Sequence, residues 1–556
     1  PVSELGLDSL GAILTRGALM RAGWELGIAD LLGRGSIRDL AQRMTPAATL
    51  TPQLQSRMQS DSRLLPTTRM QQSILAATEK DESRTAYIVQ QIHRVDPTRF
   101  DQNRLRTAFQ QLVEGHAALR TTVGVDASGE HIQVIHDDVE ATVVVEQFVD
   151  GPHLDRLLRT DRETPFDLSR APLARLYWLT PAGHEADACL VLTYHHLILD
   201  GYSQNLILEE LLGLHDDTLE PTLDAASEQA NHAVLMRELA EDSVGAAHYE
   251  ELLQGFDDSH GAAVFSSPVP DGSPIGSTHL VTSRATRERA MHLASRAGTT
   301  LSSVIETAWS VVLQQFSGLH DVAYGKIVTR RSSTVGEALS AAGLFISSVP
   351  ARVRADAHTT VNDVLGEVHR QSLLAAVHDA MGLDARIRTL YLFENWNAAR
   401  ARIAAEGLRR DEASTEQTGM DLTFIASDDG EQLTFHALYA GLRMGRDAVD
   451  LLLERVLVIL ETMAEDPSTP IRRLPVTVDG DRDKDAFDGS PSPHGRVETV
   501  FDAVVAEHGD HPAVVDGDRT LTYHDLDAAA DTCAALLWDS GVRPKDRVGV
   551  VASWGH

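Results

Sequence analysis

The sequence predicts a mixed α/β (α+β) protein that is divided into more than one domain. The chain has 556 residues, whereas a domain usually takes about 100–200. Its central part alternates amphipathic stretches of helical period, such as 101–119, with short β-rich runs, such as 188–194. Polar, Pro-containing segments at 46–62 and 478–497 predict linkers on either side of that central part.

The composition excludes several classes of partner. A formal net charge of −32 argues against nucleic-acid binding, because phosphate recognition needs clustered Lys and Arg. No stretch approaches the ~18 consecutive apolar residues of a membrane helix, so we expect no membrane partner. The two cysteines, Cys189 and Cys533, provide neither a disulfide framework nor a Cys-rich metal site. A reducing cytoplasm is the predicted location.

The first part of the chain, residues 1–45, predicts a small helical unit. We expect a helix from about Ser9 to Ala22, a connecting turn, and a second helix that starts near Ser36. Ser9 stands at an N-cap position, where a short polar side chain accepts a hydrogen bond from the helix backbone. The predicted linker at 46–62 follows.

The body of the chain, residues 63–477, is large enough for two lobes. We place an N-lobe at about 63–230 and a C-lobe at about 240–477. The least periodic stretch, around 216–275, is the candidate hinge between them.

The last part, residues 498–556, predicts a helix, a strand hairpin, a helix and a strand. It follows the predicted linker at 478–497. The sequence stops directly after a strand that ought to feed a larger sheet, so we expect it to be a fragment of a longer polypeptide.

A pair of adjacent histidines provides the strongest chemical signal. A buried strand ends at Tyr194, a turn-like segment holds His195 to Gly201, and Ser203 is placed to cap the next helix. Histidine has an ordinary pKa of about 6.5, so it is largely neutral near pH 7 and can accept a proton. The pair therefore suits general-base chemistry, with two buried structural histidines as the alternative.

Metal binding is a second alternative for this pair, and we disfavour it. Adjacent residues in extended structure point to opposite faces, and no nearby Cys or Glu-x-x-His completes a site, so no metal is predicted. The same alternation turns one imidazole toward a cleft and the other into the lobe. Asp200 is better explained as structural, and its burial would require an Arg partner from elsewhere in the body.

The segment HHLILDG, residues 195–201, resembles the His-His-x-x-x-Asp-Gly motif of nonribosomal peptide synthetase condensation domains. These domains belong to the chloramphenicol acetyltransferase-like superfamily. The resemblance covers most of residues 63–477 and implies a two-lobed, V-shaped condensation domain. Other segments resemble the family's motifs in family order: 64–75, 115–123, 321–333, 343–353 and 390–396.

The flanking parts carry resemblances of their own. ELGLDSL, residues 4–10, resembles the Leu-Gly-x-Asp-Ser motif of carrier proteins. This implies that 1–45 is the C-terminal part of a peptidyl or acyl carrier domain, and that a phosphopantetheinyl transferase attaches 4′-phosphopantetheine to Ser9. A helix N-terminus favours a phosphate ester there. LTYHDL, residues 521–526, resembles the first adenylation-domain motif, which implies that 498–556 is the N-terminal fragment of an adenylation domain.

The resemblance also implies roles for the site residues. His196 would face the tunnel where two substrates meet, with His195 supporting it. Asp200 would pair with Arg331, and Gly201 would let the backbone turn without a side-chain clash.

The implied reaction is an acyl transfer that forms an amide. The amine of an aminoacyl thioester on a downstream carrier would attack the acyl thioester on an upstream carrier. His196 would take the proton or orient the amine, and the sequence leaves both roles open.

Some positions depart from the family pattern. Gly115 and Ala117 stand where the second motif usually has Arg and Glu. Arg330 stands where a Gly usually precedes Arg331, so either arginine is a candidate partner for Asp200. Tyr202 stands where many members have Trp.

Other functions remain as alternatives. An epimerisation domain shares the histidine motif, but is normally followed by a condensation domain rather than by an adenylation-like segment. A heterocyclising domain would carry aspartates in place of the histidines. A non-catalytic scaffold for docking carriers, and an acyltransferase that uses soluble coenzyme A thioesters, are the alternatives from other classes.

Overall fold

A computed structural model of the chain divides into two compact units, residues 1–478 and 479–556, and each is described by itself. Within the part of the chain that the structure describes, no helix is long and apolar enough to cross a membrane. The described residues are 15, 19, 24–26, 30–31, 36–46, 63–81, 83–126, 131–183, 186–219, 225–241, 244–256, 275–329, 331, 341–356, 358–375, 387–394, 402–411, 420–440, 444–475, 497–516 and 519–543.

In the first part of the chain, the helix predicted near Ser36 is confirmed as α3 (Ile37–Arg43). Ser36 caps it, and reciprocal hydrogen bonds between Ser36 and Asp39 complete a capping box. Ser9 and most of the helix predicted around it lie outside the described residues. Two short strands also pair antiparallel: β1 (Trp24–Glu25) and β2 (Thr45–Pro46).

The first half of the body is built on a five-stranded sheet of order β14-β4-β9-β8-β7. Strands β7 and β8 pair parallel, and the other neighbours pair antiparallel. The central strand β9 is buried along its whole length, which explains why its sequence is a continuous apolar run. The strands are β4 (Ile88–Val95), β7 (Thr142–Phe148), β8 (Ala174–Pro181), β9 (Ala188–His195) and β14 (Arg409–Arg410).

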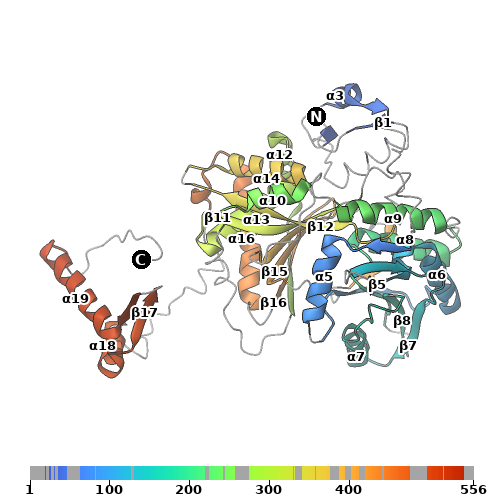
Figure 1. Ribbon diagram of the computed structural model, residues 1–556, viewed down its shortest axis with the longest axis horizontal. Helices are drawn as coiled ribbons and strands as arrows, with labels where there is room; N and C mark the ends of the chain where they lie inside the picture. Colours follow the sequence, from blue (N-terminus) through green and yellow to red (C-terminus); the bar gives the residue numbers. More distant parts are fainter. Residues whose placement is uncertain are drawn as a thin grey trace. The chain divides into compact units, whose positions relative to one another are not determined.

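Helices cover both faces of this sheet (Figure 1). The main core lies between one face and helices α6 and α8, while α7 packs on the other face against residues such as Ile92 and Val191. A second sheet of order β3-β6-β5 completes this half. The remaining elements are β3 (Leu64–Pro66), α5 (Arg69–Lys80), α6 (Gln102–Gly115), the 3₁₀ helix η2 (Ala117–Arg120), β5 (Thr121–Val125), β6 (His131–Ile135), α7 (Gly151–Arg162) and α8 (Gly201–His215).

The second half of the body is built on a six-stranded sheet of order β10-β16-β15-β13-β11-β12. Four helices pack together against it, and Trp309 stacks on Phe424 at a ring distance of 4.7 Å in their shared core. The elements are β10 (Ile275–Val281), α12 (Arg284–Ala297), α13 (Leu301–Ser317), β11 (Asp321–Thr329), β12 (Ile346–Arg354), α14 (Val361–Ala375), β13 (Thr389–Glu394), β15 (Leu422–Asp428), β16 (Leu433–Ala440), α16 (Arg446–Glu465) and the 3₁₀ helix η3 (Ile471–Arg473).

The stretch at 216–275 contains two helices, α9 (Ala225–Glu241) and α10 (Val244–Leu252), so its weak periodicity did not mean irregular structure. Its role as a hinge stays a prediction. The buried apolar residues described in α9 are consecutive, at 233–236, and its other apolar residues are mostly alanines, so the helical period is weak in the sequence. Three of the buried residues, Ala233, Leu235 and Met236, pack with residues of both halves, including Ile135 and Phe345.

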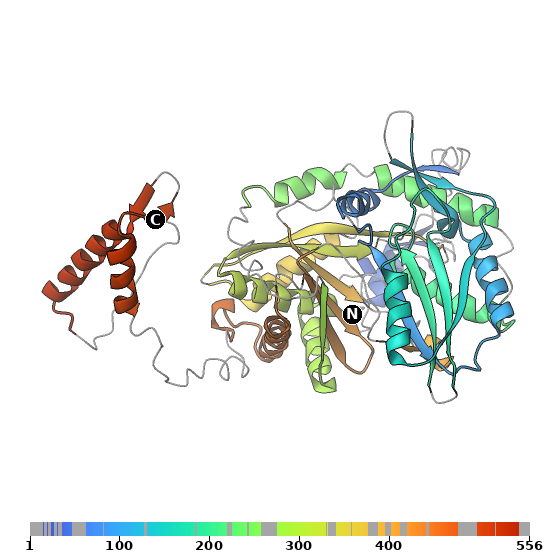
Figure 2. The same cartoon turned by 90° about the horizontal axis from the view of Figure 1, so that it is seen from below.

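The second half of the body contributes one strand to the sheet of the first half. β14 follows β13 in the sequence, yet it pairs antiparallel with β4 at the edge of the first sheet. Figure 2 shows this short strand in orange among the blue and green strands of the first half. The Asp411 backbone N–H donates to Ile92 O at 2.8 Å, and Arg94 forms an ion pair with Asp411. The assumption that each lobe is continuous in sequence is therefore wrong for this segment.

The second unit contains the predicted helix, hairpin and helix. Thr522 caps α19, and Asp525 completes the capping box. The predicted final strand, within 544–556, lies outside the described residues. The elements are α18 (Val497–His508), β17 (Pro512–Asp516), β18 (Arg519–Thr522) and α19 (Tyr523–Asp539).

A buried histidine organises the segment that departs from the second family motif. His116 Nε2 lies 2.7 Å from Glu210 Oε2 of α8, and Nδ1 lies 3.7 Å from Glu228 Oε1 of α9. Glu228 also accepts a 2.9 Å hydrogen bond from the Ala117 N–H, so a carboxylate from α9 stands beside the position where the motif usually has Glu. Burial lowers the pKa of His116, but the two carboxylates outweigh burial and raise it to about 9.

We expect His116 to make folding stability depend on pH. Because its pKa in the folded state exceeds the unfolded value of about 6.5, its contribution is complete below that pH and is lost as the pH rises through 9. The loss should amount to about 3 kcal/mol of unfolding free energy. Denaturant titrations at both ends of this range measure it. His116→Gln should lack the effect, and an unchanged pH dependence in that variant would contradict a charged His116.

Candidate active site

His195 is directed into the first half of the body. Strand β9 ends at His195, one residue beyond the predicted end. The Leu197 N–H donates to His195 Nδ1 at 3.3 Å, and His195 Nε2 lies 3.4 Å from Thr78 Oγ1 of α5. Thr78 Oγ1 donates to Ile74 O, so it accepts from Nε2–H. Burial, and then the neighbouring His196, lower the pKa of His195 to about 3, which keeps the ring neutral.

His196 is directed to the other side and lines a cavity of about 490 Å³. Its backbone N–H donates to Tyr87 O at 2.8 Å. The rings of Tyr87 and Tyr194 lie edge-on to the imidazole, each with its centroid 6.4 Å away. The two imidazoles therefore diverge, as the alternation of extended structure predicts.

Asp200 is the N-cap of α8, so the prediction that Ser203 is the cap is wrong. Asp200 Oδ1 accepts from the Ser203 N–H at 2.8 Å, and Oδ2 accepts from the Phe345 N–H at 2.9 Å. Ser203 Oγ donates at 2.6 Å to Gly343 O. Aspartate takes the cap because its second oxygen can at the same time bind the backbone of the other half.

The predicted pairing of Asp200 with Arg331 is confirmed, with Arg331 Nη2 at 3.2 Å from Asp200 Oδ1. Both side chains are almost fully buried. The Arg331 guanidinium lies between the rings of Tyr202 and Phe345, at 4.2 and 4.6 Å from their centroids. Arg330, the other candidate partner, lies outside the described residues.

Gly201 lines the cavity, and the predicted absence of a side-chain clash there stays a prediction. It is the first residue of α8 and so has a helical backbone, which any residue can adopt. Cys189, predicted to pack, is confirmed as a buried core residue on the face of the sheet that α7 covers, where burial raises its thiol pKa to about 11.

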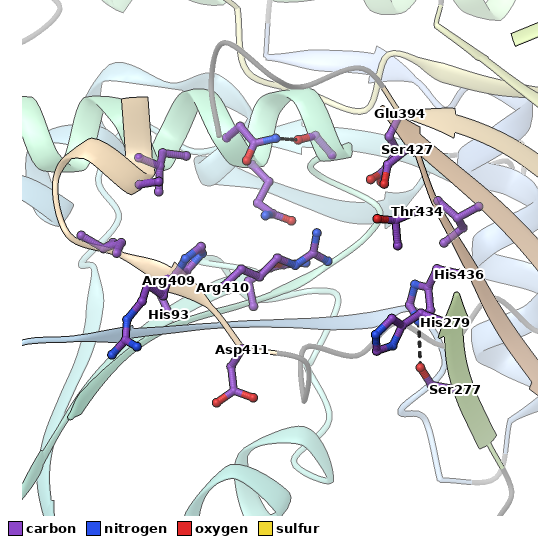
Figure 3. Close-up of a pocket in the computed structure, with 18 of the residues that line it drawn as sticks. His93, Ser277, His279, Glu394, Arg409, Arg410, Asp411, Ser427, Thr434 and His436 are labelled. Atoms are coloured by element: carbon purple, nitrogen blue, oxygen red, sulfur yellow. Dashed lines mark hydrogen bonds between the residues drawn. The ribbon is translucent and has the colours of Figure 1, made fainter. Parts of the chain in front are cut away.

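The second half of the body supplies the far wall of the cavity (Figure 3). His279 of β10 stands directly opposite His436 of β16, and Ser277 Oγ lies 2.8 Å from His436 Nε2. Sequence reasoning missed these residues. Alternation in β16 was an available signal, because Phe435 and Ala437 face the core and place His436 on the opposite face.

Segment 402–411 closes another side of the same cavity. In Figure 3, Arg409, Arg410 and Asp411 lie near His93, across from the wall that carries Thr434 and His436. Arg409 forms an ion pair with Asp187 of the first half. Local sequence patterns do not predict the ion pair between Arg409 and Asp187, because the two residues are far apart in the chain.

Comparison with known families decides the identity of the body. Residues 62–484 match the condensation domain family. The chain belongs to this family. Residues 501–556 match the AMP-binding enzyme family, so a partial AMP-binding region follows the condensation domain. Amide-bond formation is the general role of condensation domains in nonribosomal peptide synthetases.

Known relatives of this condensation domain are peptide synthases. The chain is 25% identical to surfactin synthase subunit 1 of Bacillus subtilis (strain 168) over 95% of its own length, and 22% identical to bacitracin synthase 3 of Bacillus licheniformis over 88%. It spans only 15% and 8% of these two proteins.

Solved condensation domains share the fold, which confirms the predicted fold class. The condensation domain from Monacolin K polyketide synthase MokA has a TM-score of 0.59 and 16% identity, with 73% of this chain and 99% of that chain covered. The first condensation domain of the calcium-dependent antibiotic synthetase, in complex with a substrate analogue, has a TM-score of 0.57 and 17% identity, with 75% and 99% covered.

We expect Asp200→Ala to lower the unfolding free energy by about 3–5 kcal/mol, because it leaves the buried Arg331 charge without its partner. Asp150→Ala is the matched control. Asp150 caps the exposed start of α7 through the His153 N–H, so its loss should cost only about 1 kcal/mol. Denaturant unfolding measures both. Equal losses would mean that Asp200 acts as a helix cap alone.

Proposed function

We propose that this condensation domain joins two carrier-bound substrates through an amide bond. The amine of an aminoacyl thioester on a downstream carrier attacks the carbonyl carbon of an upstream acyl or peptidyl thioester. The C–N bond forms, the C–S bond breaks, the amine loses a proton, and the upstream thiol leaves. The observation that carries this proposal is the position of His196, whose imidazole lines the cavity beside the junction between β9 and α8.

His196 is the residue that we assign to the reacting amine. An α-amine has a pKa of about 7.7–8.0, so it is mostly protonated at neutral pH and must lose a proton as the bond forms. A cavity-lining imidazole can accept that proton, or can orient the amine and stabilise the tetrahedral intermediate. His195, Asp200 and Arg331 act as positioning residues. They fix the strand end and the helix start on either side of His196.

A covalent acyl-enzyme plays no part in the proposal. Cys189 lies on the opposite face of the sheet from the cavity wall, and its raised thiol pKa disfavours the nucleophilic thiolate. The incoming thioester is already activated, so direct attack by the amine is sufficient.

The cofactor and partners of the proposal come from the flanking segments. We assign residues 1–45 to a carrier domain and Ser9 to the attachment of 4′-phosphopantetheine by a phosphopantetheinyl transferase. This group holds the acyl chain as a thioester. The AMP-binding region that follows the condensation domain supports coupling over epimerisation. Both cysteines are free thiols, which suits a reducing cytoplasm.

The test is to load the upstream carrier with an acyl group and to supply a downstream carrier that bears an aminoacyl thioester. We expect His196→Ala to slow amide formation by about 100-fold or more. His153→Ala, which changes an imidazole on α7 outside the cavity, is the matched control and should couple at the wild-type rate.

Two outcomes would overturn the proposal. Equal product from His196→Ala and the wild type would remove the assigned role of His196. Return of the donor with inverted configuration and without coupling would establish epimerisation instead.

A further inference from the structure

Two polar side chains of β4 are buried in the cavity wall without a hydrogen-bond partner. Gln91 and His93 are only 7% and 5% exposed. Among the described residues, nothing pairs with Gln91 Oε1 or with either ring nitrogen of His93. Buried polar groups are nearly always hydrogen-bonded, because desolvation is otherwise uncompensated. These atoms are therefore candidates to receive a ligand.

Both side chains lie on the same face of the sheet as the cavity. Gln91 pairs with Leu192 and His93 with Leu190, and Tyr194 follows on the same face of β9. Gln91, His93 and Tyr194 form a polar row on this face, and all three line the same cavity as His196. The row thus begins beside His196 and runs along β4.

The strand fixes the spacing of the row. Residues two apart in a strand are separated by about 7 Å, which is therefore the Gln91 to His93 repeat. The His196 N–H bonds Tyr87 O, so Gln91 stands about 13 Å along the strand from that point, and His93 about 20 Å. An extended peptide has the same two-residue repeat of amide groups. The two amides of a pantetheine arm lie closer together than this.

The charges of the cavity favour an uncharged ligand. Burial, and then the nearby Arg410, lower the pKa of His93 to about 4, so its ring is neutral and offers one donor and one acceptor. Gln91 offers the same pair of functions. The formally charged lining residues are two arginines and two carboxylates, Arg409, Arg410, Glu394 and Asp411, so neither sign dominates. An amide, which also carries one donor and one acceptor, matches this wall.

We propose that Gln91 and His93 hydrogen-bond successive same-side amides of an extended peptide held in the cavity, and so select a peptidyl substrate over an aliphatic acyl chain. At about 3.3–3.6 Å per extended residue, a peptide reaches Gln91 with about four residues and His93 with about six. This proposal rests on the proposed function, since it names the substrate class of the same cavity.

The experiment measures binding to the full chain with three stable probes, each attached to aminopantetheine through an amide. The probes carry acetyl-(Gly-Ala)₃, a saturated acyl chain of equal length, or acetyl alone. The variants are Gln91→Leu, His93→Leu and the double variant. Apolar replacement of an unpaired polar group is nearly neutral or stabilising, so we expect the variants to fold and to melt no lower than the wild type.

For the peptidyl probe we expect each single variant to weaken binding about threefold to tenfold, and the double variant more. The other two probes should bind as they do to the wild type. An equal loss for the acetyl probe would assign the contacts to the pantetheine arm and overturn the proposal. Unchanged binding of the peptidyl probe would overturn it as well.

Gln90→Leu is the matched control. Gln90 directly precedes Gln91 in β4, but its side chain points to the other face of the sheet, where it donates to Leu158 O at 2.9 Å and to Asp161 of α7. Its loss should lower stability while leaving the ratio of peptidyl to acyl binding unchanged. A changed ratio would mean that general loosening of β4, rather than the two cavity groups, sets the preference.

Coupling assays with the wild type and the variants separate this proposal from the proposed function. Suppose that the wild type binds the peptidyl probe selectively, the double variant loses this selectivity, and no amide product forms. This result would support the binding site and contradict the proposed function. If the variants couple peptidyl and acyl donors at the same rates as the wild type, the result would support the proposed function and contradict the binding site.

Discussion

The buried ion pair between Asp200 and Arg331 is the interaction on which the site depends. Two charges have been removed from water, and their mutual attraction offsets the cost only because hydrogen bonds from Ser203 and Phe345 satisfy the remaining carboxylate lone pairs. The pair joins the start of α8 in the first half to residues 341–345 in the second half. His196 lies directly before this anchored turn, so its position is set by both halves of the body.

The adjacent histidines show how one local geometry gives two chemical states. His195 is buried in the core, where Thr78 Oγ1 accepts a hydrogen bond from its Nε2–H and the Leu197 N–H donates to its Nδ1, which fixes a neutral tautomer. His196, on the opposite side, meets two aromatic edges and the cavity. The two histidines are therefore not interchangeable in the mechanism, although they are adjacent in the sequence. The environment, rather than the residue type, assigns the role.

Sequence reasoning reached the parts of the site that local pattern or burial dictates. The two-residue alternation of a strand predicted that His195 and His196 point in opposite directions. The cost of burying Asp200 predicted a cationic partner, and the family resemblance named Arg331. Sequence reasoning did not reach the walls that come from distant strands. His279, His436 and Arg410 line the cavity because the second sheet and β14 pack there. Local alternation indicates which face of β16 carries His436, but it does not predict what that face packs against. The helix α9 was missed because its buried apolar residues are consecutive and most of its other apolar residues are alanines, which leaves a weak helical period.

The pairing of β14 with β4 has a consequence for synthesis of the chain. Arg94 and Asp411, whose ion pair accompanies the pairing of β4 with β14, are 317 residues apart in sequence. At a translation rate of about 5–20 residues per second, β14 is synthesised tens of seconds after β4, and the edge of β4 stays unpaired until then. During that interval an open strand edge is available to other chains, as unpaired edges invite aggregation. A ribosome-bound first half is therefore a natural client for chaperones, and expression of that half alone would leave the edge open permanently.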